Sequence, residues 1–303
     1  MVSKRILPYI AIGFTLFVIG FSSISASPAF ERVNETGIRR LEVEASLLNV
    51  EINGGSGDVL TGWGEDIPKN VVVNYRRRGD VLRIWVEKRF APFALRKNGR
   101  LFFEVPEEID LDIRTSSGGI IIRNMESQNL FISSSSGDIG ASRIESPVEV
   151  KSSSGDINLG MIEGDIRAES SSGRMELINV AGDVTATASS GDIRLSAVEG
   201  DLEISSTSGR IVLSSTNGTV FAHTSSGDIV GEDVRITGDA LFKTSSGSID
   251  MDFDNRLNDL SFRLTSSSGN LQVGDLKGER NLAAGEGTIR VSGESSSGDQ
   301  SYR

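Results

Sequence analysis

Apolar and polar positions alternate with a period of two along most of this chain, in short runs separated by small residues. Ile157 and Leu159 flank Asn158, and nine residues further on Ile166 and Ala168 repeat the pattern. Such alternation is typical of β-strands that bury one face. The pattern therefore predicts a succession of short strands with one apolar face each.

The strands recur at a fixed interval marked by a Ser-Ser-Gly or Thr-Ser-Gly turn. From Gly137 to Gly227 successive turn glycines are 18 residues apart, and a second glycine such as Gly164 lies halfway. A fixed period predicts a solenoid. We expect an all-β fold, a parallel β-solenoid of the β-helix or β-roll kind, with about 18 residues per coil in two 9-residue halves. The glycines that we expect to shape its turns are Gly137, Gly155, Gly173, Gly191, Gly209 and Gly227.

The position after the turn glycine alternates in charge along successive coils, with aspartate in one coil and arginine in the next. Opposite charges on neighbouring strands stabilise a sheet, whereas a column of cation ligands would not contain arginine at every second place. We therefore expect structural roles at this position for Asp138, Asp156, Asp192 and Asp228. The halfway aspartates, which we expect to be solvated or to cap backbone amides, are Asp165, Asp183, Asp201 and Asp239. We also expect the serines directly before the glycines, such as Ser153 and Ser154, to form hydroxyl ladders.

Two other solenoids also have coils of 18 residues. A left-handed hexapeptide helix needs an apolar residue at every sixth place, but Glu163 and Glu169 occupy the places that follow Ile157, which excludes it. The calcium β-roll repeats G-G-x-G-x-D-x-U-x. Its nearest match here begins at Gly54 and puts Asp58 one place early, so a calcium-dependent roll stays an alternative.

The rest of the chain divides around the repeats. Residues 1–29 are expected to be a signal peptide or an N-terminal membrane anchor, because Lys4 and Arg5 precede an apolar run that ends in small residues. We assign residues 30–115 to an N-terminal β cap with the first strands, and residues 116–293 to the solenoid repeats. The last segment, 294–303, begins a turn with no clear strand after it, so we expect a frayed tail.

Within the cap, Gly79 and Asp80 separate two β-branched runs and predict a hairpin. We expect Trp63 and Trp85 to be its larger core residues. The tripeptide Arg78-Gly79-Asp80 matches a ligand motif of animal integrins, but a hairpin turn explains its glycine and aspartate equally well.

Composition excludes several kinds of chemistry. The chain has no cysteine, so it has neither disulfides nor thiolate sites, and His223 is its only histidine. A net charge of −11 argues against nucleic acid and anionic membrane surfaces as partners. We expect no catalytic residues and no cofactor, with calcium as the alternative. Its weak candidate ligands are Asp250, Asp252 and Asp254, which would share one face of a strand.

The repeats resemble a bacterial family labelled "putative adhesin", a domain of unknown function rich in Ser-Ser-Gly-Asp-Ile units. The resemblance covers roughly residues 40–295 and is most specific at Leu101–Pro106 leading into Thr115–Ile120, and then at Ser136–Ile139. It implies an all-β repeat fold in envelope or exported proteins and no established enzyme activity. The aspartate of the family pattern is replaced at Arg174, Arg210, Ser248 and Asn270.

These observations together predict an exported, non-enzymatic β-solenoid that serves as a structural, adhesin-like or interaction module of the cell envelope. We expect it in the periplasm, on the cell surface or outside the cell, with contact to the membrane only through an uncleaved N-terminus. The expected partner is a protein or glycan of the envelope, and end-to-end pairing of solenoids would give a homo-oligomer. The alternatives are a β-helix enzyme acting on envelope polysaccharide and the calcium-dependent roll.

Overall fold

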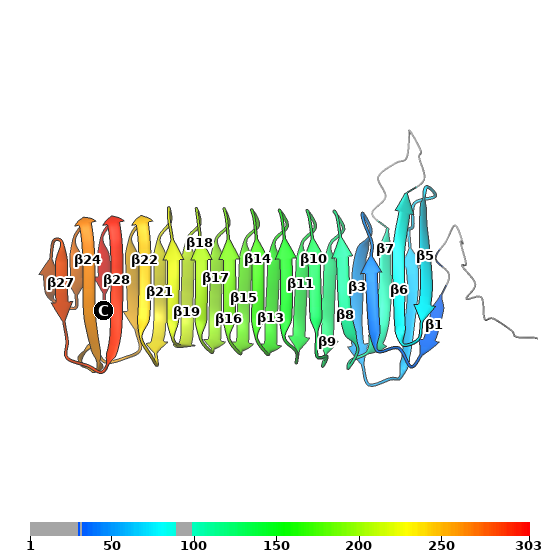
Figure 1. Ribbon diagram of the computed structural model, residues 1–303, viewed down its shortest axis with the longest axis horizontal. Helices are drawn as coiled ribbons and strands as arrows, with labels where there is room; N and C mark the ends of the chain where they lie inside the picture. The colour runs from blue at the N-terminus through cyan, green and yellow to red at the C-terminus, as the bar shows by residue number, and fades with distance from the viewer. Residues whose placement is uncertain (1–29, 31, 89–98) are drawn as a thin grey trace, which may run out of the picture.

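The structure is a computed structural model that describes residues 30, 32–88 and 99–303. Over these residues the chain forms 29 strands and one short 3₁₀ helix, η1 (Leu257–Asp259), arranged in two long sheets. Figure 1 shows the strands side by side along the long axis of an elongated molecule. The predicted signal peptide or anchor, 1–29, lies outside the described residues.

The two sheets face each other, and each coil contributes one strand to each sheet. Over the described residues, the fifteen strands of the first sheet are, in spatial order, β1 (Val33–Thr36), β4 (Val59–Glu65), β7 (Arg100–Pro106), β3 (Asn49–Gly55), β9 (Ile120–Met125), β11 (Ile139–Ile144), β13 (Ile157–Glu163), β15 (Met175–Ala181), β17 (Ile193–Glu199), β19 (Ile211–Gly218), β21 (Ile229–Ile236), β23 (Ile249–Phe253), β29 (Gln300–Tyr302), β25 (Leu271–Val273) and β26 (Leu276–Gly278). The fourteen described strands of the second sheet are β27 (Asn281–Ala284), β24 (Leu260–Ser268), β28 (Ile289–Ser297), β22 (Ala240–Ser246), β20 (Val220–Thr224), β18 (Leu202–Ser206), β16 (Val184–Ala188), β14 (Ile166–Ser170), β12 (Val148–Ser152), β10 (Leu130–Ser134), β8 (Asp110–Thr115), β2 (Arg40–Glu44), β6 (Val81–Lys88) and β5 (Val71–Arg78).

Equivalent residues of successive coils lie opposite one another in parallel register. Ile157 pairs with Met175 and Met175 with Ile193, while on the second sheet Ile166 pairs with Val184. All five side chains are buried. A buried aliphatic side chain contributes about 1.5–3 kcal/mol, so the ladder supplies the stability that a chain without cysteine needs. The predicted parallel β-solenoid is confirmed.

A row of buried hydroxyl groups follows the corner that holds the Ser-Ser-Gly turns. Ser152 Oγ donates a hydrogen bond to the carbonyl oxygen of Gly155 at 2.8 Å. Ser153 and Ser154 are exposed, so the predicted hydroxyl ladder lies one position earlier than expected, because the residue facing the core is the last of the strand. The buried row includes Thr115, Ser134, Ser152, Ser170, Ser206, Thr224 and Thr244.

At the N-terminal end, the coil that comes first in the sequence is not first in space. β2 and β3 lie between the coil of β6 and β7 on one side and the coil of β8 and β9 on the other. Residues 30–115 thus supply solenoid coils as well as the antiparallel strands that cover the end.

The C-terminal end is built in the same way. β28 and β29 lie between the coil of β22 and β23 and the coil of β24 and β25, and Figure 1 shows the red β28 between β22 and the orange β24. The predicted frayed tail, 294–303, is therefore wrong, and the predicted end of the repeats at residue 293 falls inside β28. The short β29 is mostly polar and shows no alternating pattern in the sequence.

Aromatic side chains hold this last coil in place. Tyr302 is fully buried, and its ring centroid lies 6.3 Å from that of Phe242, 6.1 Å from Phe253 and 5.7 Å from Phe262. Burial raises the pKa of the Tyr302 hydroxyl above its usual value, while the hydroxyl donates to Gln300 Oε1 at 3.2 Å. These contacts explain why the chain end is ordered.

Antiparallel strands form the outer edges of both sheets over the described residues. The predicted hairpin is present as β5 and β6, with Gly79 in the left-handed region at φ 63°. Trp63 and Trp85 are only half-buried, so their predicted core positions are wrong. Ile84 faces the core, and the alternation of the strand turns its neighbour Trp85 outward. No helix in the described part of the chain is long and apolar enough to cross a membrane.

Candidate functional site

Seven consecutive strands of the first sheet, from β9 to β21, each contain one non-glycine residue in the left-handed region, with φ between 51° and 58°. This conformation interrupts the alternation of the strand, so that this residue and the second one after it are both turned to solvent. Because the interruption has the same register in every coil, it forms a continuous crease across the sheet. The seven residues are Asn124, Arg143, Met161, Asn179, Ala197, Ser215 and Asp233.

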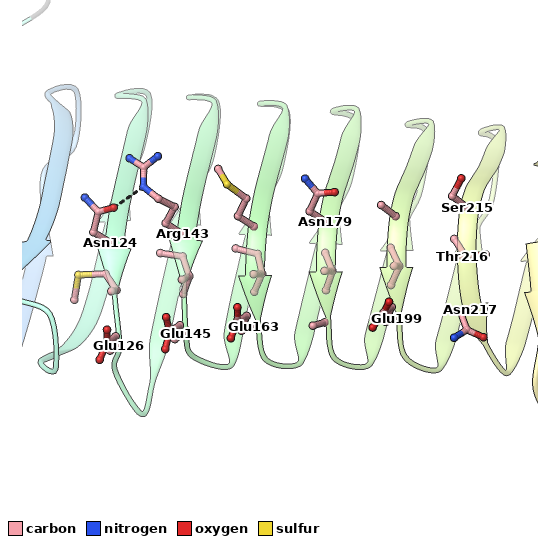
Figure 2. A pocket seen from close by; sticks show the side chains of 18 of the residues that line it. Asn124, Glu126, Arg143, Glu145, Glu163, Asn179, Glu199, Ser215, Thr216 and Asn217 are labelled. Atoms are coloured by element: carbon pink, nitrogen blue, oxygen red, sulfur yellow. Dashed lines mark hydrogen bonds between the residues drawn. The ribbon is translucent and has the colours of Figure 1, made fainter. Parts of the chain in front are cut away.

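The crease is a groove with a volume of about 810 Å³, and Figure 2 shows its two rows of outward side chains. The left-handed residues form the first wall. The floor contains the buried residues Met125, Ile144, Ile162, Val180, Val198 and Thr216. The second wall contains Glu126, Glu145, Glu163, Ala181, Glu199, Asn217 and Arg235. Six steps of about 4.8 Å give the groove a length of about 29 Å along the solenoid axis.

The second wall carries negative charge that no neighbouring cation neutralises. Glu126, Glu145, Glu163 and Glu199 make no ion pair within the described chain, and neither does Glu107, which extends the row at its N-terminal end. Carboxylates at strand spacing raise the local negative potential, because each adds to the field of the next.

Neither basic residue that lines the groove forms an ion pair with the glutamates of the second wall. Arg143 Nε donates a hydrogen bond to Asn124 Oδ1 at 2.6 Å, along the first wall (Figure 2). At the far end, Arg235 Nη1 lies 2.9 Å from Asp254 Oδ2. The carboxylates are therefore available to a ligand.

Charges on the outer face of the second sheet offer a contrast. Lys151 Nζ lies 3.0 Å from Glu149 Oε1 and 3.6 Å from Glu169 Oε2. The hydrogen bond that Lys151 donates to Glu149 is the main cause that raises the pKa of Lys151 above its usual value. Glu149 and Glu169 therefore have a cation within reach, which the glutamates of the groove lack.

The floor of the groove contains one polar side chain where its neighbours are aliphatic. Thr216 pairs with Val198 on one side and Val234 on the other, and it is 1% exposed. Its hydroxyl has no hydrogen-bond partner among the described residues. A buried hydroxyl without a partner costs about 1–3 kcal/mol, so this position is less favourable than its aliphatic neighbours.

The predicted turn residues shape the solenoid and lie away from the groove. A Cβ built on Gly155 would come within 3.0 Å of the carbonyl oxygen of Gly137, and the same close approach repeats from coil to coil through Gly227. The reason for glycine at this corner is therefore close stacking of backbones. At the halfway turn, Gly164 combines such an approach with a φ of 151°, which only glycine adopts easily.

The predicted aspartate columns bind backbone amides. Asp156 Oδ1 accepts a hydrogen bond from the N–H of Arg174 at 2.8 Å, so aspartate is needed in one coil and any residue serves in the next. The neighbouring Asp138, Asp192 and Asp228 act in the same way. The halfway column does likewise, since Asp183 Oδ1 accepts from the N–H of Asp201 at 2.8 Å. The expected structural role of both columns agrees with this geometry.

The candidate calcium ligands lie on or just after β23. Asp250 Oδ1 is 2.9 Å from Arg303 Nη1, and Asp254 is the carboxylate paired with Arg235. Asp252 is half-buried on the same strand. No group of three acidic, histidine or cysteine residues in the described chain is placed to hold a metal ion.

The remaining candidates are also apart from the groove. His223 lies on the second sheet, in register with Ser205 and Lys243. The hairpin turn contains Arg78, Gly79 and Asp80. The carbonyl oxygen of Asp80 accepts hydrogen bonds from the backbone N–H groups of Arg39 and Arg40.

The sequence analysis missed the groove, although a signal for it exists. In the central coils the alternation breaks twelve residues before the next turn glycine, and a glutamate often follows two places later, as in Met161-Ile162-Glu163 before Gly173. The break lies inside a strand, so neither the turn glycines nor the buried positions of the repeat reveal it.

A family model, Toastrack DUF4097, matches this sequence over residues 38–201 and again over 147–303. The chain belongs to the toastrack DUF4097 family. The resemblance found in the sequence is thereby confirmed, and the two overlapping matches agree with a repeated architecture. No curated protein matches the sequence.

Solved structures that are similar to this chain come from several bacteria. They include a "putative cell adhesion protein" from Clostridium sporogenes (10% identity, 90% of this chain and 98% of that one, TM-score 0.22). A "putative lipid binding protein" from Parabacteroides distasonis has 17% identity (75% and 98%, TM-score 0.41). A "putative adhesin" from Bacteroides fragilis has 14% identity (91% and 99%, TM-score 0.31). Because these identities and TM-scores are low, the assignment of the chain to its family rests on the family model alone.

Proposed function

We propose that this chain is an exported, non-enzymatic binding module of the bacterial cell envelope, and that its groove takes an extended ligand with several positive charges. The single observation that carries the proposal is the row of five glutamates on one wall, none of which has an ion-pair partner in the described chain. Export is supported by the charged and apolar pattern of the first residues.

The shape of the groove favours an extended ligand. It crosses seven strands at right angles to their direction, so a compact ligand would contact only a few coils. A segment of a basic protein, running along the solenoid axis, would meet one carboxylate for about every 4.8 Å of its path where the row is continuous.

The repeated geometry argues for binding rather than catalysis. Acid–base catalysis by two carboxylates needs environments that push their pKa values apart. Glu126, Glu145 and Glu163 occupy equivalent, exposed positions of successive coils. The proposal also needs no metal, because the charges of the ligand would neutralise the row.

The test is fluorescence anisotropy with labelled hexalysine, using labelled hexaserine as the neutral probe. We expect hexalysine to bind, with an affinity that falls as salt is added. A triple variant, Glu126→Gln/Glu145→Gln/Glu163→Gln, should weaken binding at least tenfold.

The matched control is Glu176→Gln/Glu203→Gln/Glu232→Gln, which changes net charge equally with residues outside the groove. It should change the affinity less than twofold. Equal losses in the two triple variants, or no binding of hexalysine at low salt, would overturn the proposal.

A further inference from the structure

A second concave site lies at the N-terminal end of the solenoid, on the outer face of the other sheet. It has a volume of about 500 Å³ and is formed by β2, β5 and β6. Its lining residues are Glu42, Glu44, Arg76, Arg78, Val81, Arg83 and Trp85. It is distinct from the groove, which belongs to the first sheet.

Strand register brings like charges together in this pocket. Arg76 on β5 lies directly opposite Arg83 on β6, and Arg78 follows two places after Arg76 on the same face. Like charges directly opposite on neighbouring strands destabilise a sheet. The fold therefore keeps an arrangement here that is unfavourable in the absence of an anion.

The two carboxylates of the pocket do not neutralise all three arginines. Glu44 Oε1 lies 2.9 Å from Arg83 Nη2, and Glu42 Oε1 lies 3.1 Å from Arg40 Nε. Arg76 and Arg78 have no ion-pair partner in the described chain. Two positive charges are left for a ligand.

Buried donors without partners point the same way. Arg76 Nε is buried and has no hydrogen-bond partner among the described residues, and the same is true of Asn74 Nδ2. Asn74 is 5% exposed and precedes Arg76 by two places, so both side chains belong to the same face of β5. Of the two, Arg76 lines the pocket, and an oxyanion bound there is the group that would satisfy its N–H donors.

The rest of the lining fits a sugar ring better than a bare anion. Trp85 lies opposite Asn74 on β5 and Glu44 on β2, so the indole stands beside the donors and next to a carboxylate. An indole offers an apolar face to the C–H groups of a sugar ring, and carboxylates accept hydrogen bonds from sugar hydroxyls. A small anion with two or more charges on one group would meet repulsion from Glu42 and Glu44.

We propose that this pocket binds a sugar residue that carries a carboxylate, as in a uronic-acid polysaccharide. Arg76 and Arg78 hold the carboxylate by charge-assisted hydrogen bonds, and Trp85 lies against the ring. This pocket shares no lining residue with the groove, so the two sites would bind different ligands.

Isothermal titration calorimetry on the full-length chain tests this site with four probes. They are trigalacturonate, trimannuronate, the neutral maltotriose and inorganic phosphate. We expect at least one uronate to bind, and maltotriose to show no heat at the same concentration. If phosphate binds as tightly as the uronates, the site recognises an anion alone and the sugar assignment is wrong.

Two variants then locate the binding. Arg76→Gln and Arg78→Gln should each weaken uronate binding at least tenfold. Arg76→Gln should also keep or raise the melting temperature, because it removes the repulsion from Arg83. A loss of binding in a protein that melts no lower cannot be ascribed to misfolding.

The matched control is Arg77→Gln, on the same strand but on the opposite face, where Arg77 pairs with Glu35 at 2.7 Å. It changes net charge by the same amount and should leave uronate binding within twofold. Equal affinity in Arg76→Gln and the wild type, or no uronate binding in the wild type, would overturn the proposal.

Discussion

The backbone N–H of Asn270 donates a hydrogen bond to Asp299 Oδ1 at 2.8 Å, although Asp299 comes 29 residues later in the chain. In the middle of the solenoid the same bond always runs from the later coil to the aspartate of the earlier one, as between Arg174 and Asp156. The direction is reversed because the last coil of the sequence, β28 and β29, lies in space between the two coils that precede it in the sequence. At both ends of the solenoid, a coil from further inside the sequence thus covers the coil nearer the chain end, as β6 and β7 cover β2 and β3.

Removing the Tyr302 ring should therefore destabilise the whole C-terminal end. Truncating a large buried aromatic side chain costs about 3–5 kcal/mol, so we expect Tyr302→Ala to lower the free energy of unfolding by that order. Urea denaturation followed by circular dichroism measures it. Leu276→Ala, at a side chain 56% exposed, is the control and should stay within about 0.5 kcal/mol. Similar small effects of the two changes would show that the tail is frayed after all.

The buried hydroxyl of Tyr302 also predicts a dependence of stability on alkaline pH. Burial raises its pKa in the folded state, so above about pH 10 the unfolded chain loses a proton that the folded chain keeps. Stability is fully present below that pH and falls as pH rises, with a slope of at most about 1.4 kcal/mol per pH unit from this group.

The comparison with Tyr302→Phe isolates this contribution from that of the lysines. Unfolding free energies of the two proteins should run parallel from pH 7 to 9 and converge above pH 10. Curves that stay parallel up to pH 11 would mean that the hydroxyl ionises in the folded state as readily as in water.

The close stacking of backbones at the Ser-Ser-Gly corner predicts a sharp contrast between glycines. Gly173→Ala would place a Cβ within 3.0 Å of the carbonyl oxygen of Gly155 and should cost about 1–3 kcal/mol or more. Gly160→Ala would place it 3.7 Å from the carbonyl oxygen of Ile178, an ordinary contact. Thermal melts should show a large fall for the first variant and almost none for the second. A tolerant Gly173 would imply that the coils are further apart than the structure has them.

The aspartate columns predict a difference between two substitutions at one site. Asp183→Ala leaves the N–H of Asp201 without its acceptor and should cost about 0.5–1.5 kcal/mol. Asp183→Asn keeps a side-chain oxygen in the same place and should lose less than half as much. If the two variants melt alike, the charge of Asp183 matters and its hydrogen bond does not.

The repeat predicts the middle of the molecule well because each coil obeys the same local rules. The alternation at Ile157 and Leu159, the turn at Gly155 and the 18-residue period together define the sheet, its register and its core. These features depend on nearest neighbours, which a one-dimensional repeat makes identical.

The ends and the sites could not be predicted in the same way. Placing β28 between β22 and β24 depends on the packing of Tyr302 with rings that are distant in sequence. The pocket at Arg76 and Arg83 depends on the register of a hairpin and on the faces of its strands. No local pattern contains either relationship.

The most direct test of the central claim is to map hexalysine on the protein by amide chemical shifts in a ¹⁵N-labelled sample. We expect the largest changes in the groove, at Glu126, Glu145, Glu163 and their neighbours on the first wall, and no change at Glu176 and Glu203. Changes spread evenly over acidic residues of both sheets would contradict it, because they would show attraction to net charge with no defined site.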